Sequence, residues 1–180
     1  MFITKIILLT ILFFITSIAD NISFSQKIKE SSSDLKATYI YNIINYINKQ
    51  GETKNRKKFT ICLHKRKILL KSLQKYEGKK VNNMQIILRE VNDKKQCLTS
   101  CQIIILPELK DKQLNIFINK AKNKNVITIS DVAGCAKKGV MIYLKDLTSK
   151  IEFEMNLKEM RKANVKLSSR ILKLSTIIER

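Results

Sequence analysis

The sequence predicts a single-domain α/β protein with a mixed, mostly parallel sheet, helices on both of its faces, and a C-terminal β-hairpin followed by helices. Two observations lead to this prediction. Apolar segments with strand-like and helix-like spacing alternate through most of the chain, which favours a parallel sheet covered on both faces. The chain of 180 residues also has only one proline and four glycines. These are too few for the many tight turns of an all-β sandwich or barrel.

The N-terminus has the features of a cleaved secretory signal peptide over residues 1–19. Lys5 supplies a positive charge, an apolar run follows from Ile6 to Ile15, and Ser17-Ile18-Ala19 offers small residues where a signal peptidase reads them. The run is shorter than the roughly 20 residues that span a membrane, so a cleaved signal is favoured over an uncleaved anchor. Cleavage after Ala19 and cleavage after Ser25 both fit.

After the signal we expect a loose polar leader over residues 20–33 and one domain over residues 34–180. The cluster Ser31-Ser32-Ser33-Asp34 can cap a helix, and apolar residues recur at helical spacing from Leu35 to Ile47. The elements expected next are a strand over Phe59–Leu63, a helix over Lys65–Tyr76 that ends at Gly78, and a strand over Val81–Val91.

The second half of the domain contains the predicted centre of the sheet. Gln102–Leu106 is mostly β-branched and apolar, which suits a central strand buried on both faces, and Pro107 ends it. The remaining expected elements are a helix over Lys110–Lys122, a strand over Val126–Ile129, a loop over Asp131–Gly139, a hairpin of Val140–Leu144 and Ile151–Met155, a helix from Leu157 capped by Asn156, and an amphipathic helix from Lys166 to Ile178.

The formal net charge of the chain is +20. A basic surface of this size attracts acidic proteins, anionic lipid and nucleic acid. The lysines are scattered, and aromatic residues for base stacking are not interleaved with them, so specific nucleic-acid binding is disfavoured. Lysine, isoleucine and asparagine are also the residues that an AT-rich genome favours. Codon usage alone can therefore account for much of the positive charge, without any function for it.

All four cysteines follow the predicted signal peptide, at Cys62, Cys97, Cys101 and Cys135. An even number of cysteines in an exported chain predicts disulfides, and four cysteines allow three pairings. The single histidine, His64, cannot complete a zinc site unless the cysteines converge on it. We therefore expect no metal and no cofactor.

Motifs of catalysis are missing from the sequence. There is no glycine-rich phosphate loop and no paired-histidine metal box. Ser168-Ser169 lacks the glycines of a nucleophile elbow, and Asp131 is expected to make local hydrogen bonds within its loop. We expect no catalytic residue and interpret the chain as a binding or regulatory protein.

Several segments, in order and spacing, resemble the YfiR family. The resemblance covers about Leu35 to Ile178. Its C-terminal half is carried by Ile127–Asp131, Gly139–Ile142, Ile151–Asn156 and Leu167–Leu174, and its N-terminal half by Leu35–Asn42 and the cysteine-bearing strands Phe59–Leu63 and Cys101–Ile105. The chain departs from the family where His64-Lys65-Arg66 replaces a glycine turn and where Lys49-Gln50 replaces a Trp-Pro pair.

The resemblance implies a periplasmic protein that binds and restrains an inner-membrane diguanylate cyclase, and so lowers cyclic-di-GMP signalling and biofilm formation. It also implies homodimers and an outer-membrane lipoprotein partner. Cys62 and Cys101 match the family's bridging pair, whereas Cys97 and Cys135 either pair with each other or are free. The alternative is an exported solute-binding or lipid-binding domain, or an adaptor to another receptor such as a histidine kinase.

Overall fold

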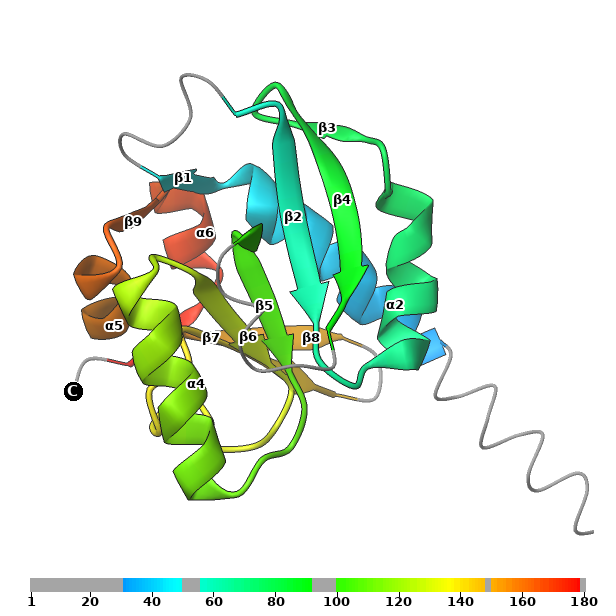
Figure 1. Cartoon of the computed structure of the whole chain (residues 1–180). Coiled ribbons are helices and arrows are strands. Elements are labelled where there is room, and N and C mark those ends of the chain that lie inside the picture. The colour runs from blue at the N-terminus through cyan, green and yellow to red at the C-terminus, as the bar shows by residue number, and fades with distance from the viewer. Residues whose placement is uncertain (1–30, 50–55, 92–99, 148–149, 179–180) are drawn as a thin grey trace, which may run out of the picture.

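The protein contains an eight-stranded mixed sheet in the order β10-β8-β7-β6-β5-β2-β4-β3 (Figure 1). This is seen in a computed structural model that describes residues 31–49, 56–91, 100–147 and 150–178. The strands are β2 (Lys58–Leu63), β3 (Lys80–Val81), β4 (Met84–Glu90), β5 (Ile103–Leu106), β6 (Ile127–Ser130), β7 (Ile142–Asp146), β8 (Ile151–Asn156) and β10 (Thr176–Ile178). A separate two-stranded sheet joins β1 (Ile47–Lys49) to β9 (Val165–Leu167).

Five neighbouring strands, β4, β2, β5, β6 and β7, are parallel. The hairpins β3–β4 and β7–β8 are antiparallel, and β10 pairs in parallel with β8. The predicted mixed, mostly parallel sheet is therefore confirmed. The order β4-β2-β5-β6-β7 is the flavodoxin-like order of doubly wound α/β proteins, in which the direction of winding reverses between β2 and β5.

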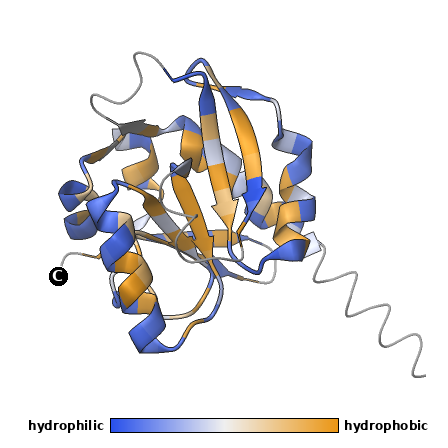
Figure 2. Ribbon diagram, viewed as in Figure 1, coloured by the Kyte–Doolittle hydropathy of each residue, from blue (hydrophilic) through white to orange (hydrophobic). Residues whose placement is uncertain are grey.

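Helices cover both faces of the sheet, as predicted. The first face packs against the helix of residues 31–45, against α2 (Lys67–Leu73) with the 3-10 turn η1 (Gln74–Tyr76), and against α5 (Leu157–Lys162) and α6 (Ser169–Lys173). The second face packs against α4 (Asp111–Asn123) and the loop that follows β6. Figure 2 shows the apolar residues concentrated on the strands and on the inward sides of these helices.

Alternate residues of the central strands belong to different halves of the core. In β2, Ile61 and Leu63 pack in the core of the first face, whereas Cys62 packs in that of the second. In β5, Ile103 and Ile105 face the first core, while Ile104 and Leu106 face the second. Because both faces are buried, these strands are continuous apolar runs without polar alternation.

The expected strand over Val81–Val91 is in fact a hairpin. Asn82 and Asn83 have φ values of 47° and 64°, and they connect β3 to β4. A two-residue hairpin turn of this kind needs positive φ at both central residues, and asparagine tolerates that region better than most residues. The Asn-Asn pair between apolar residues was the turn signal in the sequence.

The expected amphipathic helix over Lys166–Ile178 is also wrong. Residues 165–167 form β9, which pairs with β1, and residues 176–178 form β10, which pairs with β8. The backbone N–H and C=O groups of these residues form hydrogen bonds with neighbouring strands instead of within a helix. Only the five residues of α6 between them are helical. Tertiary pairing has overridden the helical spacing of the apolar residues.

Two smaller expectations have clear outcomes. The Asn156 side chain accepts a hydrogen bond from the Glu159 backbone N–H at 3.1 Å, so its predicted role as the cap of α5 is confirmed. Residues 31–33, placed at the end of the predicted leader, are already helical, while residues 20–30 and the signal peptide lie outside the described residues. Within the described ranges, every helix is too short or too polar to cross a membrane.

Candidate functional site

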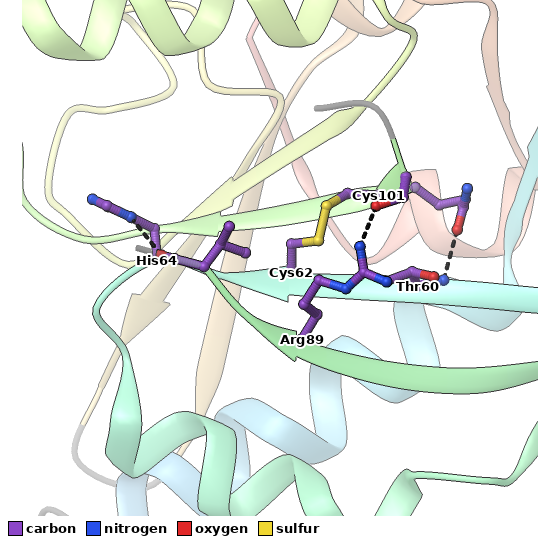
Figure 3. Close-up of a disulfide and its surroundings, with 8 residues drawn as sticks. Thr60, Cys62, His64, Arg89 and Cys101 are labelled. Carbon is purple, nitrogen blue, oxygen red and sulfur yellow. Dashed lines mark hydrogen bonds between the residues drawn. A yellow bond between two sulfur atoms is a disulfide. The ribbon is translucent and has the colours of Figure 1, made fainter. Parts of the chain in front are cut away.

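The structure joins Cys62 of β2 to Cys101, just before β5, by a disulfide (Figure 3). Their Cα atoms are 5.8 Å apart, within the range that a bridge requires. Both cysteines are buried in the second half of the core. The bridge therefore anchors the segment that enters β5 to the neighbouring strand.

Hydrogen bonds around the bridge connect the same segments (Figure 3). The Thr60 backbone N–H donates to the Gln102 side chain at 2.6 Å, and the Arg89 guanidinium donates to the Ser100 hydroxyl. His64 is buried, with Nδ1 2.8 Å from the Val91 carbonyl oxygen. These contacts give Thr60, His64 and Arg89 structural roles beside the disulfide.

Cys135 is a buried free cysteine in the loop after β6. Burial raises the pKa of its thiol to about 12, and the nearby carboxylates of Asp131 and Glu154 act in the same direction. The thiol is therefore protonated and unreactive at neutral pH. Cys97 lies outside the described residues, so the state of that cysteine stays a prediction.

An ionic cluster joins the N-terminal helix to the carboxyl ends of β2, β6 and β7. Lys36 Nζ, from the N-terminal helix, lies 2.8 Å from the carboxylate of Asp131 and 3.0 Å from that of Asp146. Arg66, just after β2, also binds Asp131, and Ser32 donates to Asp146. Asp131 was expected to bond locally, but these partners are 95 and 65 residues away.

The pKa values within this cluster follow from its charges. Burial alone would raise the pKa of Asp131, but the hydrogen bonds and charges of Lys36 and Arg66 outweigh burial and hold it below its ordinary value. Burial would lower the pKa of Lys36, but the two carboxylates outweigh that effect and raise it. Each charge is thus stabilised by its partners, so the cluster fixes the N-terminal helix to the sheet and is unsuited to proton transfer.

An open cleft of about 780 Å³ lies between the N-terminal helix, β8, and the α6–β10 segment. Its apolar lining includes Tyr39, Tyr46, Phe153 and Ile171. The rings of Tyr39 and Phe153 are 6.1 Å apart in an edge-to-face arrangement. This volume is within the range of ligand-binding pockets. No pattern in the sequence indicated the cleft, because its walls come from segments that are far apart in the chain.

The residues considered for chemistry in the sequence are not brought together as a catalytic group. Ser168 precedes α6, and its buried hydroxyl has no hydrogen-bond partner among the described residues. The imidazole of His64, the only histidine of the chain, packs against the ring of Phe117 of α4, with ring centroids 5.4 Å apart. Across the described ranges, no three His, Cys, Asp or Glu side chains are grouped as they would be around a metal ion.

The strand order, the disulfide and the two-sided core define a disulfide-bonded, doubly wound α/β domain. More particularly, the chain belongs to the YfiR/HmsC-like family, whose model matches residues 33–176. This confirms the resemblance found in the sequence. No curated protein matches the chain.

The chain is similar to two solved structures. A conserved domain protein from Vibrio cholerae has a TM-score of 0.53 at 7% identity, and the match covers 80% of this chain and 60% of that one. A ligand-free, open substrate-binding protein with adhesive properties from Clostridium difficile has a TM-score of 0.48 at 10% identity, with 69% of this chain and 55% of that one covered. The chain therefore spans less than two thirds of either structure, and the first of them supports the fold alone.

Proposed function

We propose that this chain is a periplasmic regulatory protein that binds and restrains a membrane-bound diguanylate cyclase, thereby lowering cyclic-di-GMP signalling and biofilm formation. The observation that carries the proposal is the family match over residues 33–176. It acts by binding rather than by catalysis. An outer-membrane lipoprotein that sequesters it and a homodimeric state are further parts of the proposal, as the family resemblance implies.

Three properties of the chain support export and binding. The N-terminal residues have the pattern of a secretory signal, and Cys62 of β2 and Cys101, just before β5, are placed to form a bridge, which persists in oxidising compartments such as the periplasm. The net charge of +20 favours association with an acidic protein surface. The open cleft beside α6 supplies a surface of both apolar and polar side chains on which a partner can dock.

Deleting the gene is expected to raise cellular cyclic-di-GMP and surface attachment, because the cyclase then loses its restraint. The measurement is nucleotide quantification by mass spectrometry in the wild type, the deletion strain and a complemented strain. A second deletion, of the cyclase, should return the nucleotide to the basal level. Unchanged cyclic-di-GMP in the single deletion, with the cyclase present and active, would count against the proposal.

The cleft also favours a second candidate, an exported solute-binding or lipid-binding domain. An aromatic-lined space of about 780 Å³ is large enough for a small amphipathic molecule. Native mass spectrometry of protein purified from the periplasm distinguishes the two functions. A retained small molecule of one defined mass favours the solute-binding domain, whereas unliganded protein that inhibits the cyclase favours the regulator.

A further inference from the structure

Two of the four exposed large apolar side chains in the described part of the chain lie at the C-terminal end of the fold. Leu174, directly after α6, is 71% exposed, and Ile177 of β10 is 43% exposed. The other two large apolar residues with high exposure lie apart from them, Ile68 on α2 and Ile116 on α4. Leu174 also lines the open cleft, so the exposed apolar surface continues into the cleft between the N-terminal helix and β8.

β10 is the outermost strand on its side of the sheet. Among the described residues it pairs only with β8, through the register Thr176–Glu154 to Ile178–Asn156. A strand with one neighbour has a row of backbone donors and acceptors that another strand can use. A polypeptide segment can therefore form backbone hydrogen bonds with this strand edge and also place side chains in the adjacent cleft. A lipid chain can occupy only the cleft.

Charges around the cleft favour an acidic occupant. Arg170 and Lys173 project from α6 and are exposed, and in the described part of the chain no carboxylate pairs with either of them. Glu152 is already held by Lys150 at 2.7 Å and by Lys145 at 3.7 Å. Because each chain has a formal net charge of +20, a second copy would bring like charges together at this surface.

We infer that the cleft and the outer edge of β10 form the docking surface for an extended acidic segment of the membrane partner's periplasmic part. The backbone of this segment pairs with β10, an apolar side chain contacts Leu174 and the aromatic lining of the cleft, and its carboxylates face Arg170 and Lys173. This surface is named here the α6–β10 surface (residues 170–178 with the adjoining cleft). The inference rests on the proposed function, because it takes the cyclase as the partner.

The test uses the disulfide-bonded protein and the purified periplasmic part of the diguanylate cyclase, with Kd measured by isothermal titration calorimetry. Leu174→Glu places a negative charge at a large apolar residue that is 71% exposed and should raise Kd at least tenfold. Lys173→Glu should also raise Kd. The matched controls are Ile116→Glu and Lys120→Glu on α4, which lies on the other face of the sheet, and both should change Kd less than twofold. Equal melting temperatures of each variant and its control would show that the fold is intact.

Hydrogen exchange gives a second readout that needs no substitution. The backbone amides of residues 176–178 should exchange more slowly in the complex, whereas those of α4 should be unchanged. If the wild type binds but Leu174→Glu and Ile116→Glu have equal effects, the α6–β10 surface is not the docking site, although the proposed function stands. If the wild type does not bind the cyclase, the proposed function fails, and the surface is then tested on its own with two other occupants.

These two occupants are a lipid surface and a second copy of the chain. Vesicles of phosphatidylglycerol and phosphatidylethanolamine that bind the wild type, but not Leu174→Glu, would assign the surface to lipid and overturn the inference. A dimer in analytical ultracentrifugation that Leu174→Glu dissociates would assign it to a second copy, with the same consequence. We expect the amides of residues 176–178 to exchange more slowly when the cyclase is present. We expect no such change with the vesicles or from self-association.

Discussion

Removing the bridge between Cys62 and Cys101 is expected to lower the free energy of unfolding by about 3–4 kcal/mol. The cysteines are 39 residues apart in sequence, and the estimate is the chain entropy that closing such a loop removes from the unfolded state. For a domain of this size, that loss lowers the melting temperature by about 10 °C. The measurement is urea unfolding and thermal melting of Cys62→Ala/Cys101→Ala beside the wild type.

A reductant distinguishes the stabilising effect of the bridge from the effect of removing two buried sulfur atoms. Adding it should lower the melting temperature of the wild type, but it should not change that of the double variant. Cys135→Ala is the matched control, since it removes a buried thiol that is free in the structure. A wild-type melting temperature that is insensitive to reductant, under conditions that reduce every disulfide to thiols, would contradict the prediction.

The second large effect is expected for Asp131→Asn, which should destabilise the protein by about 2–3 kcal/mol. Breaking a buried ion pair on one side typically costs 3–5 kcal/mol, and the partial exposure of Lys36 and Arg66 reduces this figure. The amide cannot neutralise the two cations that the carboxylate now holds. Asp111→Asn is the control, because the Asp111–Lys138 pair is exposed and its loss should leave the melting temperature nearly unchanged.

This prediction includes a dependence on pH. The pKa of Asp131 is lower in the folded protein than its ordinary value, so its stabilisation is fully present above that ordinary value, near pH 4, and is lost as pH falls through the folded pKa. The difference in melting temperature between the wild type and Asp131→Asn should therefore be constant from pH 5 to 8 and shrink below pH 4. A difference that persists unchanged at pH 2 would show that the charge of Asp131 does not stabilise the fold.

The central sheet could be predicted from the sequence because its strands are buried on both faces. The apolar run Ile103–Leu106 could hardly be anything but a central strand, and the alternation of strands with helices set the parallel connections. The C-terminal segment could not be predicted in the same way. Its apolar residues, from Leu167 to Ile178, have helical spacing, and only pairing with β1 and β8 makes two parts of it extended.

The candidate site was partly visible in the sequence. The even cysteine count predicted disulfides but left three pairings open, and the family resemblance pointed to Cys62 and Cys101 as a pair. The ionic cluster of Lys36, Arg66 and Asp131 left none, since it depends on which strand ends meet at one edge of the sheet. The cleft was invisible for the same reason. Sites formed by side chains from distant segments require the fold before they can be recognised.

The most direct measurement is the rate of cyclic-di-GMP synthesis by the membrane-bound cyclase, with and without this protein on the periplasmic side. Proteoliposomes or spheroplasts that contain the cyclase should form the nucleotide more slowly as the disulfide-bonded protein is added, and the inhibition should saturate. Leu174→Glu should require a higher concentration than Ile116→Glu for the same inhibition. A synthesis rate that does not change at saturating protein, with a cyclase shown to be active, would contradict the account.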